Sequence, residues 1–569
     1  MNEWPMLLVG GIGMVGVNIK KLLMVVCCII PASVGASGVR ACASVANNDV
    51  LSAYSVSEKG CTKYIEIELT SGESGAATFV IVSDIDADDV VISSGALVGG
   101  GAEYQGAISL KYIKSWYRGH DANKTIRFSP GGPLLVPDLL VKDDDFIRVD
   151  KIKNKNYIKT SSGYLEASEL DGFIKSGGSV GDTEKLSLAK LARGEVKPIW
   201  ISALLPEGAK PGVYEGKINI LSQKKMINQS LGIKVRLLPV RLVAPLIEYS
   251  IYYRSVLSLG PVSELSDLRK KQVMLEELKD MKMHGISNPT IYEPINSASS
   301  LNEIIAMRKE AGLDNSNLYL LGVNTQDYKN IYKVEKTEKL IAGLMDKLQS
   351  SGVHNLSIYG IDEAEKDDLQ GQIALWERYR KNGIKIFSAT WQPNLYPYLA
   401  GNIDVVINGI PGNKAVNDFY KNRGTKPYLY NNPQVGIEDP NLYRRNYGIR
   451  AWQFGYDGVM PYAYQHAMHS IWDDFDDPQF RDHVFAYPTS NGVIDTLAWE
   501  GFKEGVGDVR YLSTLLSLQG RFPSSDIDRL INNIKSDLTS SPGEIRGLII
   551  NQILSICNRN KVAKGDVCL

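Results

Sequence analysis

The sequence predicts a mixed α/β protein, namely a (β/α)8 TIM barrel preceded by an all-β sandwich domain and followed by C-terminal helices. Three successive patterns indicate this order. Residues 45–247 form short alternating segments between Gly, Ser and Asp turns, and residues 248–496 alternate apolar segments with helical stretches. Helical spacing dominates residues 497–569. A chain of 569 residues is long enough for these domains.

The first domain is predicted from strand-like segments such as residues 63–69 and 77–82, in which apolar and polar side chains alternate. Several short strands at this spacing are typical of a β-sandwich. Residues 211–216 read as a turn before the last strand, so we expect the sandwich to end near residue 247.

The second domain contains eight apolar segments that we interpret as barrel strands. They are residues 249–256, 286–292, 318–323, 356–361, 384–389, 405–410, 427–430 and 458–464. Eight strand–helix units favour a closed barrel, with a doubly wound open sheet as the alternative. Beyond residue 497, apolar residues recur near helical spacing, which predicts helices packed on the outside of the barrel.

Residues 1–44 resemble an extension followed by a signal peptide. Lys20 and Lys21 precede the apolar residues 22–30, and small residues follow as far as Ala36. We therefore expect a secreted or periplasmic protein, with an uncleaved anchor as the alternative. Residues 11–16 match G-x-G-x-x-G, but no acidic residue follows at the required spacing, so we interpret the match as chance.

Composition restricts the partners and cofactors. The 63 Lys and Arg nearly balance the 64 Asp and Glu, which gives no electrostatic basis for binding nucleic acid or an anionic membrane. No metal-binding motif is present, so we expect no cofactor. After signal removal, the local disulfide pairings would be Cys42–Cys61 and Cys557–Cys568. The oligomeric state is left open.

The sharpest chemical feature is an apolar segment that ends in two carboxylates, Asp362 and Glu363. Active sites of such barrels lie at the carboxyl ends of the strands. Neighbouring side chains on a strand point to opposite faces, so both can share a pocket only if the strand ends or bends, which Gly360 permits. Two close carboxylates raise one pKa, as a glycosidase requires. The alternative is a helix cap or a solvated turn.

The carboxylate pair resembles the Asp–Glu pair of glycoside hydrolase family 123, which are β-N-acetylgalactosaminidases with a β-sandwich and a TIM barrel. Residues 451–458 are similar to the approach to that family's eighth strand. Residues 499–512, which begin Trp499-Glu500, are similar to a C-terminal signature of the family and its relatives. Ala498 departs from the pattern, where Arg commonly precedes the Trp.

The resemblance implies retaining, substrate-assisted hydrolysis of a glycan. Glu363 would be the acid and base, and Asp362 would hold the substrate's 2-acetamido group. We predict that further side chains bind the sugar: Trp391, Tyr430, Asn431, Trp452, Tyr456 and Asp457. Two alternatives remain, namely a retaining glycosidase with Asp457 or Glu438 as nucleophile, and a non-catalytic carbohydrate-binding protein.

Overall fold

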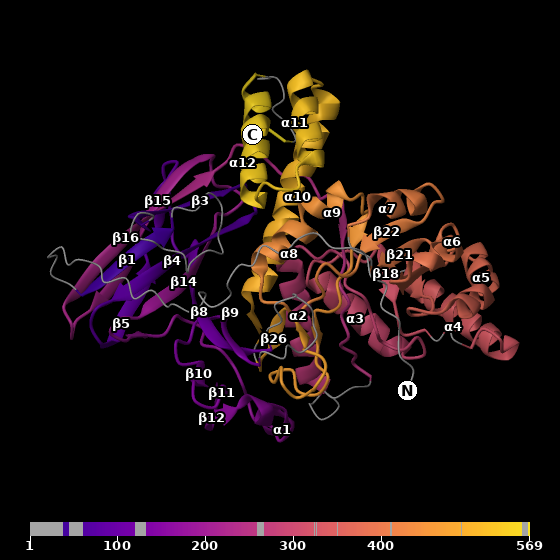
Figure 1. Cartoon of the computed structure of the whole chain (residues 1–569), viewed down its shortest axis with the longest axis horizontal. Coiled ribbons are helices and arrows are strands. Elements are labelled where there is room, and N and C mark those ends of the chain that lie inside the picture. Colours follow the sequence, from indigo (N-terminus) through magenta and orange to yellow (C-terminus); the bar gives the residue numbers. More distant parts are fainter. Residues whose placement is uncertain are drawn as a thin grey trace, which may run out of the picture. The chain divides into compact units, whose positions relative to one another are not determined.

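A computed structural model describes residues 38–44, 61–119, 132–258, 267–323, 325, 327–349, 351–409, 412–490, 492–559 and 567–568. The expected signal peptide and the G-x-G-x-x-G match lie outside the described residues, as does the side chain of Cys61. The described chain is mixed α/β, as predicted (Figure 1).

Two antiparallel-rich sheets form the first region and enclose one hydrophobic core. Alternation along the strands explains this shared core. In strand β3 (Tyr64–Leu69), Ile65, Ile67 and Leu69 point inward and are buried, while the residues between them are more exposed. The first sheet has the order β2 (Cys61–Thr62), β1 (Val39–Ser44), β4 (Ser74–Ser83), β14 (Val196–Leu204), β8 (Ile108–Arg118), β9 (Leu134–Val141).

The second sheet runs β13 (Ala189–Leu191), β5 (Ala87–Ser94), β15 (Gly212–Ser222), β16 (Ile227–Leu237), β3, with β6 (Leu97–Gly99) and β7 (Ala102–Tyr104) attached. The pairing of β16 with β3 is parallel. The region is not purely β as predicted, because helix α1 (Leu170–Lys175) follows a small sheet of β10 (Ile147–Asp150), β11 (Lys155–Thr160) and β12 (Gly163–Glu166).

A parallel sheet forms the second region. Its order is β17 (Glu248–Tyr249), β23 (Gly458–Val459), β22 (Lys426–Leu429), β21 (Val405–Asn408), β20 (Lys385–Thr390), β19 (Asn355–Tyr359), β18 (Asn317–Leu320). Alternate residues enter two different cores: Ile386 and Val406 pack with the surrounding helices, whereas Phe387 and Ile407 join a cluster on the opposite face. Burial on both faces is typical of parallel sheets.

The described residues give this sheet seven strands, one fewer than predicted. The exception is residues 286–292, where Pro289 has no N–H to donate to a neighbouring strand. The segment still spans the two edge strands, because Thr290 N donates to Ile251 O and Ile291 N donates to Tyr319 O. Closure into a complete eight-stranded barrel therefore remains a prediction.

Helices alternate with the parallel strands, and Figure 1 shows α4 to α7 along the outer side of β18, β21 and β22. The set comprises α2 (Asp267–Met283), α3 (Ala298–Glu310), α4 (Ile331–Gln349), α5 (Lys366–Lys381), α6 (Tyr396–Leu399), α7 (Lys414–Lys421), α8 (Pro440–Tyr447) and α9 (Ile449–Gln453). Short pairs β24 (Gln465–His466) with β25 (His483–Val484), and β26 (Ala486–Pro488) with β27 (Val493–Asp495), follow.

The C-terminal region is helical, as predicted, with α10 (Leu497–Arg521), α11 (Ser525–Ser536) and α12 (Pro542–Arg559). Trp499 and Phe502 of α10 belong to the same core as the parallel strands. The predicted Cys557–Cys568 disulfide is present, and Cys42 is also disulfide-bonded. Among the helices described, none is both long and apolar enough to cross a bilayer.

Helix α10 is also fixed by a buried carboxylate. Asp508 is fully buried and accepts hydrogen bonds from Arg444 of α8, at 2.8 Å and 3.1 Å, and from Arg546 of α12. One carboxylate thus joins three helices that are far apart in sequence.

We expect Asp508→Ala to lower the free energy of unfolding by about 3–5 kcal/mol, because it removes the carboxylate paired with the buried Arg444 and one of the two carboxylates paired with Arg546. Asp88→Ala is the control, since Asp88 pairs with Lys224 on the surface, where a pair contributes about 0–1 kcal/mol. Denaturant titration measures both. Equal losses in the two variants would contradict the assigned role of Asp508.

Candidate active site

Asp362 and Glu363 follow strand β19, which ends at Tyr359, after the two residues Gly360 and Ile361. Because the strand has ended, the two neighbouring side chains are no longer forced to opposite faces. Both residues are exposed, and Glu363 has φ of +42°, in the left-handed region that non-glycine residues rarely adopt. Such strain often marks functional sites. The Tyr359 hydroxyl donates a 2.5 Å hydrogen bond to Asp362 Oδ1.

Five tyrosines gather beside this pair, each from a different segment of the parallel region; we refer to them as the tyrosine cluster. They are Tyr252, Tyr292, Tyr359, Tyr430 and Tyr462. The Tyr252 ring is buried at the centre, with its centroid 6.4 Å from Tyr359, 5.9 Å from Tyr430 and 5.3 Å from Tyr462. The cluster continues the inner core of the sheet and forms an aromatic floor with hydroxyl groups.

The electrostatics of the pair are asymmetric. Although Glu363 is exposed at the surface, neighbouring groups exclude part of the water around its carboxyl group, which raises its pKa, and the negative charge of Asp362 raises it further. Burial also raises the pKa of Tyr430, and the negative charges of Glu363 and Asp362 raise it further. The site thus combines a carboxyl group of raised pKa, Glu363, with a hydrogen-bonded neighbour, Asp362, an arrangement suited to proton transfer.

Three other predicted residues lie at the same carboxyl edge of the sheet. Trp391 follows β20 and its side chain is 55% exposed, and Tyr430 and Asn431 follow β22 and are half-buried. An exposed indole beside polar groups offers a face on which a pyranose ring can stack. The structure thus brings Trp391, Tyr430 and Asn431 to the edge that carries the carboxylates.

The remaining predicted residues precede β23 and so lie at the amino edge of the sheet, away from the pair. Trp452 of α9 packs between the sheet core and the C-terminal helices, with Lys535 Nζ 5.8 Å from its ring centroid. Tyr456 is buried in the sheet core, and burial raises its pKa to about 12. Asp457 forms a 2.9 Å ion pair with Lys421. The structure does not bring these three residues to the pair.

Glu438, an alternative nucleophile in the sequence analysis, is buried between two arginines. Arg118 of β8 lies 3.2 Å from its carboxylate, and Arg481 also contacts it. Both cations also contact Asp474. This buried group links the first sheet to the loops of the parallel region.

Sequence reasoning overlooked most of the tyrosine cluster. The sequence pattern predicts apolar strands that contain Tyr252, Tyr292 and Tyr359, and it does not single out these residues as part of a site. Tyr292 and Tyr359 share one signal, a position near the carboxyl end of a predicted strand, whereas Tyr252 lies in the middle of the predicted strand 249–256.

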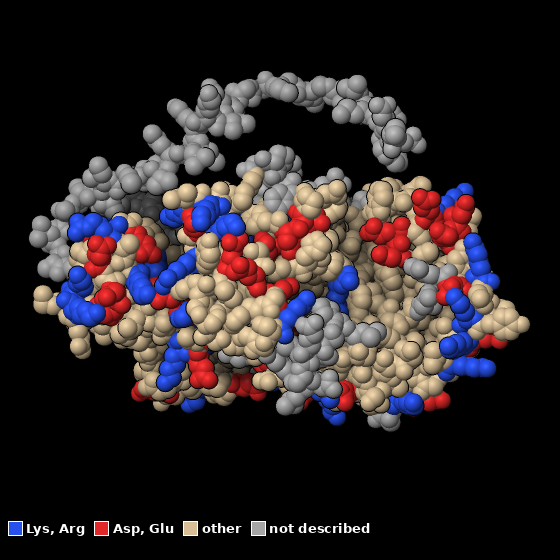
Figure 2. Space-filling view, turned by 90° about the horizontal axis from the view of Figure 1, so that it is seen from below, with Lys and Arg blue, Asp and Glu red and all other residues tan. Residues whose placement is uncertain are grey.

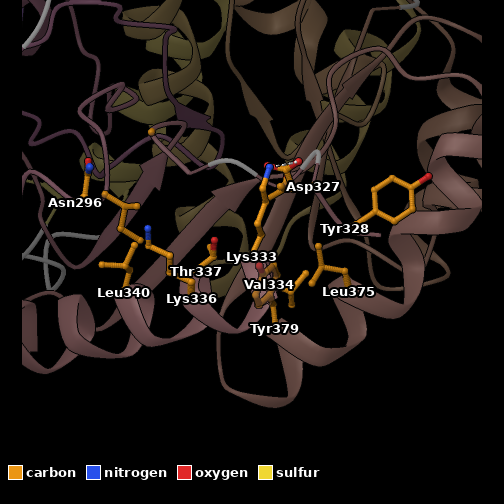
Figure 3. Close-up of a pocket in the computed structure, with 13 residues that line it drawn as sticks. Asn296, Asp327, Tyr328, Lys333, Val334, Lys336, Thr337, Leu340, Leu375 and Tyr379 are labelled. Atoms are coloured by element: carbon orange, nitrogen blue, oxygen red, sulfur yellow. Dashed lines mark ion pairs between the residues drawn. The ribbon is translucent and has the colours of Figure 1, made fainter. Parts of the chain in front are cut away.

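A cavity of about 400 Å³ lies elsewhere, between α4 and α5, and does not include the carboxylate pair (Figure 3). Lys333 and Asp327 form a 3.0 Å ion pair within it, above an apolar floor that includes Val334, Leu375 and Tyr379. Thr325 connects the two places, because its hydroxyl donates a 2.8 Å hydrogen bond to Gly360 O.

One buried group has the residue types of a metal site: Asp280, His284 and Asp495. Burial alone would lower the pKa of His284, but the adjacent carboxylates of Asp280 and Glu500 raise it to about 10. The imidazole is therefore a cation at neutral pH. Lys111 lies 2.6 Å from Asp495, so protonated and ammonium groups already balance these carboxylates.

Neither a protein-family model nor a curated protein matches the sequence. Among solved structures, a family 123 glycoside hydrolase from Clostridium perfringens is similar, with a TM-score of 0.62 and 14% sequence identity, over 92% of this chain and 99% of that chain. Two other solved structures are only distantly similar. An endo-beta-1,4-mannanase from Thermotoga petrophila has 12% sequence identity and a TM-score of 0.32, over 47% of this chain and 77% of that chain. A beta-glucuronidase from Parabacteroides merdae has 8% sequence identity and a TM-score of 0.31, over 77% of this chain and 51% of that chain.

The first comparison confirms the expected resemblance to family 123 at the level of the fold. The two folds are similar although only 14% of the residues are identical. The chain therefore has a glycoside hydrolase-like fold, shared with a family 123 enzyme over nearly the whole length of both chains.

Proposed function

We propose that the protein is a retaining β-N-acetylgalactosaminidase that uses the 2-acetamido group of its substrate as the nucleophile. The observation that carries the proposal is the pair itself: Asp362 is held by Tyr359, beside a Glu363 whose pKa is raised. The pair lies at the carboxyl edge of a parallel sheet within a glycoside hydrolase-like fold.

Each carboxylate has one task in this mechanism. Asp362 accepts a hydrogen bond from the acetamido N–H and so directs the acetamido carbonyl oxygen at the anomeric carbon. Glu363 gives its proton to the glycosidic oxygen as the bond to the leaving group breaks, and an oxazolinium ion forms. Glu363 then accepts a proton from the water that attacks the anomeric carbon, which restores the acetamido group and gives net retention.

The positions of the other carboxylates favour this mechanism over one with a protein nucleophile. Asp457 lies at the opposite edge of the sheet and pairs with Lys421. Glu438 is buried between Arg118 and Arg481. Asp457 therefore lies away from Asp362 and Glu363, and the buried carboxylate of Glu438 already pairs with two guanidinium groups, which does not suit a nucleophile.

Two further features belong to this proposal. Trp391 supplies a stacking face for the sugar, and Tyr430 with Asn431 supplies hydrogen-bonding groups, while a closed eight-stranded barrel frames the site. We also propose that the protein is secreted or periplasmic. The signal-like N-terminus and the Cys557–Cys568 disulfide support export, because disulfides persist in oxidising compartments.

The central experiment compares an aryl β-N-acetylgalactosaminide with the matching galactoside that lacks the acetamido group. We expect turnover of the first alone, and a fall of about 10²–10⁴-fold in Glu363→Gln with a poor leaving group. Glu365→Gln, the same change two residues away, should retain activity. Equal turnover of both sugars would exclude the acetamido mechanism, and binding without turnover would favour a carbohydrate-binding protein.

The negative charge of Asp362 should affect the pKa of Glu363. We expect Asp362→Asn to lower the pKa of Glu363 toward its ordinary value, because removal of a nearby negative charge favours the ionised form. Carbon-13 NMR of Glu-labelled protein measures this pKa, with Glu363→Gln to assign the signal. An unchanged or higher pKa would show that the two carboxyl groups do not interact.

The Tyr359 hydroxyl should matter through Asp362. We expect Tyr359→Phe to reduce kcat by about 10-fold or more, since a hydrogen bond to a charged group contributes roughly 1.5–3 kcal/mol, while the ring keeps its packing on Phe387. Tyr319→Phe is the control, because that hydroxyl bonds Tyr428 within the inner core. Loss of activity in the control alone would contradict the positioning role.

A further inference from the structure

Arg254 lies at the rim of the tyrosine cluster, directly after the buried residues 249–253 of the predicted first barrel strand. Its side chain is exposed, and the guanidinium carbon lies 5.4 Å from the Tyr292 ring centroid and 5.9 Å from that of Tyr462. Its Nη1 also donates a hydrogen bond to the Tyr462 hydroxyl. Two rings and one hydroxyl therefore hold the cation in place.

The acidic residues around Arg254 are bound to other groups. Tyr253 and Ser255, its two neighbours, donate to Glu277. The amides of Leu257 and Ser258 donate to Glu293. Figure 2 shows acidic and basic side chains intermixed on one face of the molecule. Within the part of the chain that the structure describes, Arg254 forms no ion pair with a carboxylate; its contacts are with tyrosines.

The groups facing Arg254 add little positive charge. His466 lies 3.0 Å from the Tyr462 hydroxyl, and burial, together with Arg254, lowers its pKa to about 4. That imidazole is neutral at physiological pH. The negative charge of Asp362 reaches the same tyrosines, because it raises the pKa of Tyr292 and Tyr462 after the larger effect of burial. Geometry connects the two charges: Arg254 bonds Tyr462 and Asp362 bonds Tyr359, and both of these rings contact the central Tyr252.

We propose that Arg254 is a specificity residue that binds an anionic substituent of the glycan, either a sulfate ester or a carboxylate. This inference rests on the proposed function, since it assigns a substrate class to the same site. A guanidinium has five N–H donors, and only one is used by Tyr462. The others suit the planar oxygens of sulfate or carboxylate. Because the tyrosines already restrict its rotamers, Arg254 loses little entropy on binding.

The competing role is purely structural, in which Arg254 only orients Tyr462. The two roles differ in what they affect. An orienting residue changes the binding of charged and neutral sugars alike, whereas an anion-binding residue changes only the difference between them.

The test measures binding by calorimetry in the Glu363→Gln background, so that it does not depend on turnover. One pair of probes is N-acetylgalactosamine 6-sulfate and N-acetylgalactosamine. The second pair is N-acetylgalactosamine linked β-1,4 to glucuronic acid and the same sugar linked β-1,4 to glucose. The first pair tests a sulfate on the bound sugar, and the second tests a carboxylate on its neighbour.

We expect one anionic probe to bind about 10-fold or more tightly than its neutral counterpart. Arg254→Gln should abolish this preference, and Arg254→Lys should retain part of it. Arg423→Gln is the matched control, since Arg423 also covers an aromatic ring, that of Phe419, but precedes β22 at the opposite edge of the sheet; it should keep the preference.

Equal affinity for the charged and the neutral probe in both pairs would overturn the proposal. An equal loss of affinity for the charged and the neutral probe in Arg254→Gln would also overturn it. Hydrolysis of the uncharged aryl β-N-acetylgalactosaminide tests the proposed function separately. A chain that hydrolyses this substrate but shows no anion preference keeps its function and loses the role assigned to Arg254.

Discussion

The candidate site depends on the parallel pairing of the strands. Because every strand of this sheet runs in the same direction, residues that follow the strands meet at one edge. Tyr252, Asp362 and Tyr462 are separated by about a hundred residues each in sequence, yet they surround one aromatic floor. Local sequence places a carboxylate after a strand, but hydrogen bonding between strands places the tyrosines beside it.

Buried charges hold the elements that frame this sheet. Asp508 joins α8, α10 and α12 through two arginines, and Glu438 joins the first sheet to the parallel region through two others. Charges as deeply buried as these are stable only when paired, so each acts as a geometric constraint. The carboxylates of the site differ from them: Asp362 and Glu363 are exposed and receive no cation within the described ion pairs, which leaves them accessible to a substrate.

Exposure and burial thus divide the acidic residues into two groups with different chemistry. Paired, buried carboxylates stabilise the fold. At the Asp362–Glu363 pair, by contrast, the backbone of Glu363 is strained and the negative charge of Asp362 disfavours ionisation of Glu363. Such an arrangement does not stabilise the protein, and it agrees with the proton-transfer role that we propose for the pair. In the function that we propose, the tyrosine cluster and Arg254 select the sugar that binds beside these carboxylates.

The sequence by itself determined the order of β-rich, α/β and helical regions, and it located Asp362 and Glu363, because periodicity and a carboxylate pair after an apolar run are local signals. Only the tertiary structure decided which other residues join them. Trp452, Tyr456 and Asp457 stand close in sequence to the last strand but precede it, so they lie at the opposite edge. The tyrosine cluster was hidden because a tyrosine that lines a site and one that packs in a core look alike until strand direction and register are fixed.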